Sequence, residues 1–173
     1  MTTDFVERLA AARIGATHNQ YADSELRRGR LQLYLEERAR AAILLVGEAP
    51  GYRGTRVSGI PLTSERQLTG FGPAEATATI VHRALDELGL AAEVLLWNVV
   101  PTHPHRLGVP ESNRRPTRSE IEQSTCFLTE LARGRRVVPL GRVAHSALGG
   151  TYVRHPAQGG AAAFRRGLAA ALQ

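Results

Sequence analysis

The stretch AILLVGEAPG, residues 42–51, decides the fold, because it has the pattern of a buried parallel strand that ends in a polar turn. Residues 42–46 are a continuous apolar run, as in strands that are covered on both faces. The run ends in Gly47, the carboxylate of Glu48 and then Ala-Pro-Gly. In open α/β sheets, sites lie beyond the carboxyl ends of the strands, which places Glu48 where chemistry is usually done. A tight turn without a chemical role is the alternative interpretation.

Strand and helix patterns alternate along the rest of the chain. Strands are predicted at residues 43–47, 93–100, 136–140 and 152–154, and helices at residues 4–13, 23–41, 73–90, 117–133, 141–148 and 161–172. Thr117 followed by Glu120 forms a capping box at the start of one helix. The order predicts an α/β fold: a three-layer α/β/α sandwich around a central, mostly parallel four-stranded sheet. Without a visible linker or repeat, residues 1–173 are expected to form a single domain.

The composition excludes several classes of protein. With 43% hydrophobic and 22% charged residues in 173, the chain is globular and not disordered. Cys126 is the single cysteine, which rules out an intrachain disulfide and any all-cysteine metal or iron–sulfur site within one chain. No apolar run approaches the roughly 20 residues that span a bilayer. The first residues lack the order of a signal peptide. We therefore expect a cytoplasmic monomer without membrane contact.

The charge of the chain favours an anionic partner. The formal net charge is +6 and the isoelectric point is near 10.6. All basic side chains are Arg, because the sequence contains no Lys. Planar guanidinium groups suit phosphate, and a positive surface attracts nucleic acid. Many soluble proteins are equally basic, so charge alone does not assign a partner.

Three polar side chains lie at the ends of predicted strands. Glu48 follows the first strand, Asn98 lies at the end of the second and His155 follows the fourth. If these strands are parallel, the three side chains converge at one edge of the sheet. Each also has a purely structural interpretation: Glu48 as the cap of a turn, Asn98 as an amide that bonds to nearby backbone, and His155 as a structural histidine. His103 and His105 suggest a metal, but they lack a third ligand at a matching spacing, and no metal site is predicted.

Five segments resemble the motifs of the uracil-DNA glycosylase superfamily, in that family's order between Ile43 and Leu168. They are GEAPG at 47–51, NVVP at 98–101, NRRPT at 113–117, PLGRVA at 139–144 and RHPAQGG at 154–160. The sequence is most similar to the thermostable branch called family four. That branch holds an iron–sulfur cluster on four cysteines, whereas this chain has one. The resemblance therefore implies a relative without the cluster and without a cofactor.

The resemblance implies a role for each strand-end residue. Glu48 would orient a water molecule or balance positive charge on the sugar, and His155 would donate a hydrogen bond to uracil O2. Asn98 would accept from uracil N3–H and donate to O4, a pattern that cytosine does not match. Ala49 stands where more distant members place an acidic or amide residue.

The residue expected to stack on the flipped base departs from the family pattern. The family usually has Phe in a Gly-X-Pro-Phe segment, but this chain has Leu62 after Gly59-Ile60-Pro61. Leu62 offers an apolar surface without a ring. Tyr52 and Phe71 are the candidates for the missing platform.

The residues expected to bind DNA flank the motif loops. The Gln158-Gly159-Gly160 segment matches the family's minor-groove loop. The candidates are Arg53, Arg56, Arg114, Arg115, Arg154, Arg165, Arg166, Gln158 and Gly159.

The sequence therefore predicts a monofunctional glycosylase that flips uracil out of single- or double-stranded DNA and leaves an abasic site. A non-catalytic, DNA- or damage-binding relative is one alternative. An α/β enzyme that acts on a small phosphorylated metabolite, with GEAPG as an anion-binding turn, is another.

Overall fold

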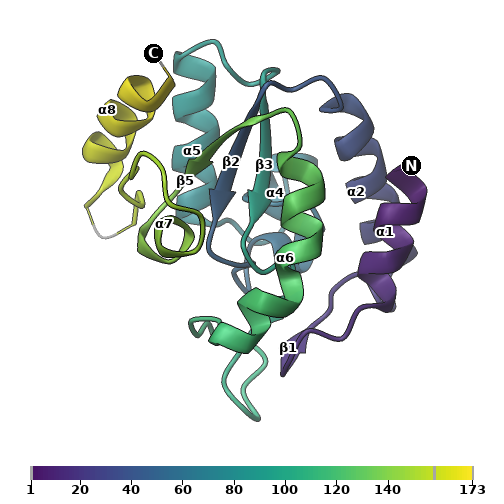
Figure 1. Ribbon diagram of the computed structural model, residues 1–173. Coiled ribbons are helices and arrows are strands. Elements are labelled where there is room, and N and C mark those ends of the chain that lie inside the picture. Colours follow the sequence, from purple (N-terminus) through teal and green to yellow (C-terminus); the bar gives the residue numbers. More distant parts are fainter. Residues whose placement is uncertain (1, 158, 173) are drawn as a thin grey trace.

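A parallel three-stranded sheet forms the centre of the protein. The computed structural model describes residues 2–157 and 159–172. Strands β2 (Ile43–Gly47), β3 (Val94–Asn98) and β5 (Arg136–Pro139) pair in the order β3-β2-β5, both pairs parallel. Figure 1 shows this sheet between two groups of helices, with α5, α7 and α8 on one side and α1, α2 and α6 on the other. The prediction of an α/β fold is confirmed.

The strands are buried for the reason that their sequences indicate. All five residues of β2 and all five of β3 are buried, as expected for apolar strands covered on both faces. Trp97 in β3 has no exposed surface, and the ring of Phe5 packs edge-on against it at 5.6 Å between ring centroids. The core therefore extends from the sheet to the N-terminal helix.

The main helices lie within a few residues of their predicted positions. In α6 the capping box is present, since Glu120 N donates to Thr117 Oγ1 (3.2 Å) and Thr117 N donates to Glu120 Oε2 (2.8 Å). These helices are α1 (Thr2–Ala11), α2 (Glu25–Glu37), α5 (Ala76–Glu87), α6 (Arg118–Ala132), α7 (Arg142–Leu148) and α8 (Ala161–Leu172).

The predicted fourth strand at residues 152–154 is reduced to a single bridge. Val153 pairs with Leu140 in an isolated parallel bridge, and the neighbouring residues make no ladder. Two glycines, Gly149 and Gly150, precede this segment and Pro156 closely follows it, so too few residues remain for a strand. The sheet of the described residues therefore has three strands, and not the four that were expected.

The predicted long loops contain short elements. The first loop, residues 49–71, holds α3 (Thr55–Ser58) and α4 (Glu65–Thr69). The second loop contains β4 (His103–Pro104), which pairs antiparallel with β1 (Thr17–His18). Helices of four or five residues and strands of two residues are too short to show a periodic pattern in the sequence.

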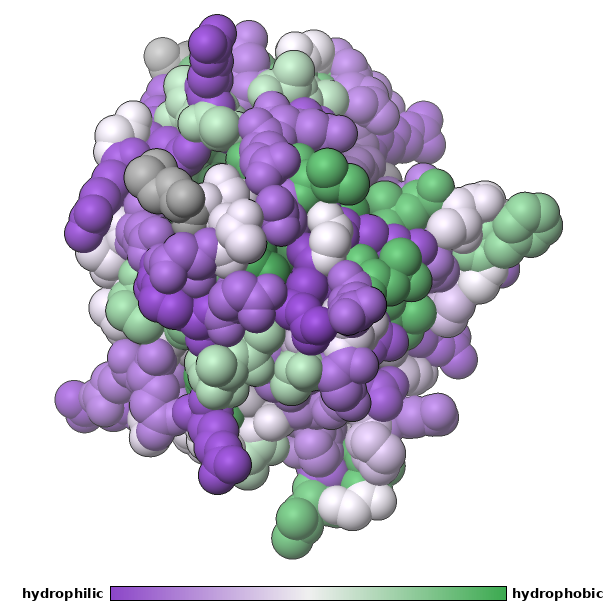
Figure 2. All heavy atoms as spheres, turned by 90° about the vertical axis from the view of Figure 1, so that its right-hand side faces the viewer, coloured by the Kyte–Doolittle hydropathy of each residue, from purple (hydrophilic) through white to green (hydrophobic). Residues whose placement is uncertain are grey.

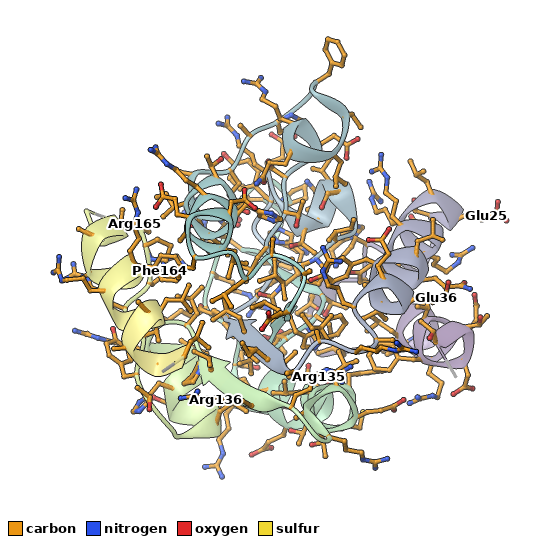
Figure 3. All side chains as sticks on the ribbon, turned by 90° about the horizontal axis from the view of Figure 1, so that it is seen from above. Glu25, Glu36, Arg135, Arg136, Phe164 and Arg165 are labelled. Carbon is orange, nitrogen blue, oxygen red and sulfur yellow. The ribbon has the colours of Figure 1, made fainter. Side chains whose placement is uncertain are left out.

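The outer surfaces of the helices are polar. Phe164 in α8 is fully buried, while Arg165, labelled beside it in Figure 3, lies 3.5 Å from Glu87 of α5 in a solvent-exposed ion pair. Figure 2 shows that the face carrying α1 and α2 is mostly hydrophilic, with its hydrophobic residues in small groups. Among the described residues, no helix combines the length and the apolar character needed to span a membrane.

A buried ion pair anchors the second loop to α6. The two terminal guanidinium nitrogens of Arg114 donate to Glu120, at 2.6 and 2.8 Å, and the Ala16 amide donates to Glu120 Oε1 at 3.2 Å. The Glu120 side chain is 2% exposed. Arg114 and the surrounding amides lower the pKa of Glu120 to about 2. Every lone pair of this carboxylate that burial removes from water has a partner.

Replacing Glu120 with Ala is expected to lower the free energy of unfolding by about 3–5 kcal/mol, because Arg114 is left without its partner. Urea denaturation at pH 7 measures the change. The exposed neighbour Glu122, paired with Arg118 at 2.8 Å, provides the control, and Glu122→Ala should change stability by less than about 1 kcal/mol. The pKa of Glu120 in the folded protein lies below the ordinary value of 4.5. The difference in free energy of unfolding between wild type and Glu120→Ala should therefore disappear as pH falls from 4.5 toward 2. Equal effects of the two substitutions would contradict this assignment.

Candidate active site

The parallel ladder continues past the ends of the strands and positions Glu48. Gly47 is the register partner of Asn98 in β3. Beyond this pair, Val99 N donates to Gly47 O (2.9 Å) and Val100 N donates to Glu48 O (3.1 Å). The backbone of Glu48 is therefore tied to the neighbouring strand at the carboxyl edge of the sheet, as the sequence predicted.

Two other loops hold the GEAPG turn in place. His103 is fully buried, and its Nδ1 donates to Pro50 O at 2.7 Å. Asn113 Oδ1 accepts a hydrogen bond from Tyr52 N at 3.0 Å. His103 is thus a brace for the turn. Among the described residues, no group of three or more His, Cys, Asp or Glu side chains could hold a metal ion.

His155 is held as a neutral donor. The Ala157 amide donates to its Nδ1 (3.2 Å), so in the neutral ring the proton is on Nε2. Burial lowers the pKa of His155, which favours this neutral form at pH 7. Gly141 packs against the ring: a methyl group there would lie 3.3 Å from His155 Cβ, and its φ of +87° also favours glycine.

Glu48 and His155 line one cavity of about 280 Å³. Ala49 and Leu62 line it too, as does Glu75, which the sequence analysis did not single out. The Glu48 side chain accepts no hydrogen bond from the described residues. Burial raises the pKa of Glu48, and the guanidinium of Arg115 opposes that shift. The cavity thus combines an acid with free lone pairs and an imidazole N–H.

A wider basic hollow of about 640 Å³ adjoins this cavity and shares Glu48 and His155 with it. Arg115, Arg142 and Arg154 line the hollow. None of the three forms an ion pair with another described residue. Unpaired guanidinium groups around one hollow favour a ligand that carries phosphate. Arg142 is an addition to the predicted set, and its place within the PLGRVA motif is the signal that could have identified it.

Asn98 lies behind the cavity and not on its wall. It is 1% exposed, and its Oδ1 has no hydrogen-bond partner in the described part of the chain. A Cβ at Gly47 would lie 2.8 Å from Asn98 Oδ1 and 3.2 Å from Leu62 Cδ2. Asn98 and the cavity-lining Leu62 therefore meet at the same point beside Gly47. A buried acceptor without a partner is a cost of about 1–3 kcal/mol, which a bound donor would remove.

Leu62 has an unusual backbone. Its φ is +50°, the one positive value for a residue other than glycine in the described segments. The hydroxyl of Thr55 accepts a hydrogen bond from Leu62 N at 3.1 Å and stabilises this conformation. Such strain is found preferentially at binding sites.

The two aromatic candidates for a stacking platform lie outside the cavity lining. Phe71 is 80% exposed, in the turn after α4. The ring of Tyr52 is covered by the guanidinium of Arg53, which lies 5.4 Å from the ring centroid. In this conformation Leu62 is the predicted wall residue that faces the cavity.

The other residues predicted to bind DNA are dispersed. Arg114 is held by Glu120 and Arg165 by Glu87, while Arg56 is half-buried with an unpartnered Nε. Arg166 and Gly159 are exposed, and Gln158 lies outside the described residues. Of the original candidates, the structure places Arg115 and Arg154 in the basic hollow.

An acid and a neutral imidazole at the carboxyl edge of a parallel sheet define an α/β protein with a candidate hydrolytic site. Residues 36–168 match the uracil DNA glycosylase superfamily, and the chain belongs to that superfamily. No curated protein sequence matches the chain. The crystal structure of SMUG2 from Pedobacter heparinus is similar, with a TM-score of 0.72 and 13% identity over 99% of this chain and 96% of that one. At this identity the likeness concerns the fold.

Replacing Gly47 with Ala is expected to destabilise the protein by about 1–3 kcal/mol, because the new methyl group would press on Asn98 and Leu62. Thermal or urea unfolding measures the change. Gly29 in α2 is the control, since nothing lies within 4 Å of a Cβ there, and Gly29→Ala should stabilise the helix by about 0.5–1 kcal/mol. Tolerance of Ala at position 47 would show that Asn98 is not confined as described.

Proposed function

We propose that the protein is a monofunctional DNA glycosylase that hydrolyses the N-glycosidic bond of uracil in DNA and leaves an abasic site. The observation that supports this most directly is that Glu48 and neutral His155 line one cavity, in a member of the uracil-DNA glycosylase superfamily. The volume of this cavity, about 280 Å³, lies just below the range of roughly 300–1,000 Å³ that is typical of small-molecule pockets. A single flipped base is a ligand of that class.

The acid and the imidazole have complementary tasks. As the bond between N1 and the sugar breaks, the sugar gains positive charge and the base gains negative charge. The Glu48 carboxylate accepts no hydrogen bond from the described residues, so it can take a proton from the attacking water or balance the positive charge on the sugar. His155 donates from Nε2 to uracil O2, where the negative charge develops. Because its imidazole is neutral, this donation does not require a prior protonation step.

Asn98 supports the choice of base. Its unpartnered Oδ1 can accept from uracil N3–H while its Nδ2 donates to O4. Cytosine has an acceptor at N3 and donors at N4, so two polar groups would remain unpaired in a buried site. This contact requires Leu62 or the backbone beside Gly47 to yield, since Asn98 lies behind the cavity lining.

The basic hollow supports DNA as the partner. Arg115, Arg142 and Arg154 would hold phosphates next to the flipped nucleotide. The sequence contains no Lys that could form a Schiff base with the sugar, which favours water as the nucleophile.

A second candidate is a relative that binds damaged or single-stranded DNA without catalysis. Two features favour this second candidate: position 62 holds Leu in place of an aromatic residue, and Asn98 lies behind the cavity lining. Salt-dependent binding of oligonucleotides without release of a base would support this second function over the first.

The wild-type protein is expected to produce alkali-labile sites in oligonucleotides that carry one uracil, in single and double strands. Glu48→Gln and His155→Ala should each slow release by about 100-fold or more while the proteins remain folded. Asn98→Asp should weaken the discrimination between uracil and cytosine. Cleavage after alkali is measured on gels over a range of pH. No base release by well-folded wild-type protein at any pH would refute the proposed activity.

Replacing Arg115, Arg142 or Arg154 by Ala is expected to weaken DNA binding to all sequences. Each loss should reduce the slope of log K against log salt by about 0.7–0.9, because one fewer counterion is released. Fluorescence anisotropy at several salt concentrations measures the slope. Arg83, paired with Glu87 on α5, is the matched control and should leave the slope unchanged. Equal slopes for all four variants would remove the hollow from the DNA-binding surface.

A further inference from the structure

Glu75 is an acid in the cavity that the mechanism above does not use. It is the N-cap residue of α5, with an extended backbone (φ −124°, ψ 125°), but its side chain makes no capping hydrogen bond. The side chain instead lines the same cavity as Glu48 and His155. An acid at an N-cap normally accepts from the amides of the first turn, so its direction here calls for another explanation.

The loop that carries GEAPG leaves room for this carboxyl. A methyl group at Gly51 would collide with Glu75 Oε1, and one at Gly54 would collide with Oε2. The last glycine of the motif and Gly54 therefore allow the backbone to approach the Glu75 carboxyl closely. This arrangement links the motif directly to α5.

The Glu75 carboxyl has no partner among the described residues. It accepts no hydrogen bond and forms no salt bridge there. The charged or titratable groups that share its cavity are Glu48, Arg114 and His155, and Arg114 is bound to Glu120. Burial raises the pKa of Glu75, and no charged side chain offsets that shift. The positive end of α5 acts in the opposite direction, but without a hydrogen bond from its amides.

A structural role does not account for this group. A half-buried carboxyl that has lost part of its water without gaining a partner weakens a fold, whereas the paired Glu120 stabilises it. Glu48 and Glu75 also differ in their surroundings, because Arg115 favours the ionised form of Glu48 alone. Two acids in one cavity whose environments separate their proton affinities are the usual arrangement of a base and an acid.

We propose that Glu75 is a second catalytic residue of the proposed glycosylase, whose protonated carboxyl donates a hydrogen bond to the departing base. The inference rests on the proposed function. As the bond between C1′ and the base nitrogen breaks, its electron pair goes to the base, which leaves as an anion. The Glu75 O–H donates a hydrogen bond to an electronegative atom of that base, where the negative charge develops. The water oxygen bonds to C1′, and Glu48 takes the water proton. Afterwards the proton on Glu48 passes through solvent to the released base.

Substitutions that separate donation from titration test this role. Glu75→Gln keeps a donor that does not ionise, and Glu75→Ala removes the donor. Glu87→Gln, at the exposed end of the same helix, is the control and should behave as wild type. Single-turnover base release is measured from pH 5 to pH 10 for all four proteins.

The wild-type rate should fall as pH rises and Glu75 loses its proton. Glu75→Gln should lack that decline, and Glu75→Ala should be slower than wild type by about 100-fold at the pH values where Glu75 is protonated. A wild-type rate for Glu75→Ala, a decline retained by Glu75→Gln, or equal losses in both variants would overturn the proposal.

Stability provides a readout that a structural role would reverse. Because the folded pKa is raised, the ionised carboxyl weakens the fold increasingly as pH rises above its ordinary range. Glu75→Gln should therefore raise the melting temperature, more at pH 8 than at pH 5. If both variants at this position unfold or melt markedly lower than wild type, the carboxyl is structural and the proposal fails.

Free uracil distinguishes failure of this proposal from failure of the proposed function. If wild-type protein releases no base from any oligonucleotide, the function fails. Uracil binding followed by NMR then tests the carboxyl alone. Binding that weakens in wild type as pH rises and Glu75 ionises, but not in Glu75→Gln, supports a donated hydrogen bond from Glu75 to the base. Binding that is unchanged in Glu75→Ala rejects that contact.

Discussion

The parallel pairing of β2 with β3 is the constraint on which the rest of the structure depends. Its register places Gly47 opposite Asn98, and its hydrogen bonds continue beyond the strands to the carbonyl of Glu48. A shift by one residue would turn every side chain of β2 to the other face of the sheet and remove Glu48 from the cavity. Because both strands are apolar and fully buried, such a shift is strongly disfavoured. The precision of the site therefore originates in the core.

Around that edge, polar groups with hydrogen-bond partners hold the loops, and two groups without partners lie in or directly behind the cavity. Glu120 and His103 are braces, each bonded to a neighbouring segment. Asn98 and Glu75 are their opposites, since their acceptors lack partners among the described residues. Proteins satisfy nearly all buried polar groups, so the unpartnered Oδ1 of Asn98 beside this cavity, together with the unpartnered carboxyl of half-buried Glu75, points to a function that is maintained at the expense of stability. The strained φ of Leu62 belongs to the same pattern.

Much of the fold could be predicted because its signals are local. The apolar run of β2, the capping box at Thr117 and the glycine-bounded helices each depend on residues close in sequence. The fourth strand was wrong because a run of three residues does not establish a ladder without its neighbours. The pairing of β1 with β4 joins segments more than 80 residues apart, and no periodicity announces it. The candidate site followed the same division: Glu48 and His155 lie in motifs, whereas Glu75 lies in an ordinary helix start.

The sequence by itself determined the order of strands and helices along the chain. It also determined the family, and the acid, amide and imidazole that the motifs carry. These depend on residue type and short spacing, which the chain carries in every conformation. The tertiary structure alone decided which groups share a cavity. It placed Asn98 behind Leu62, gathered Arg115, Arg142 and Arg154 around one hollow, and brought Glu75 against two glycines of a distant loop. The physical reason is that such neighbours are set by the packing of separate segments on a common sheet, which no single segment encodes.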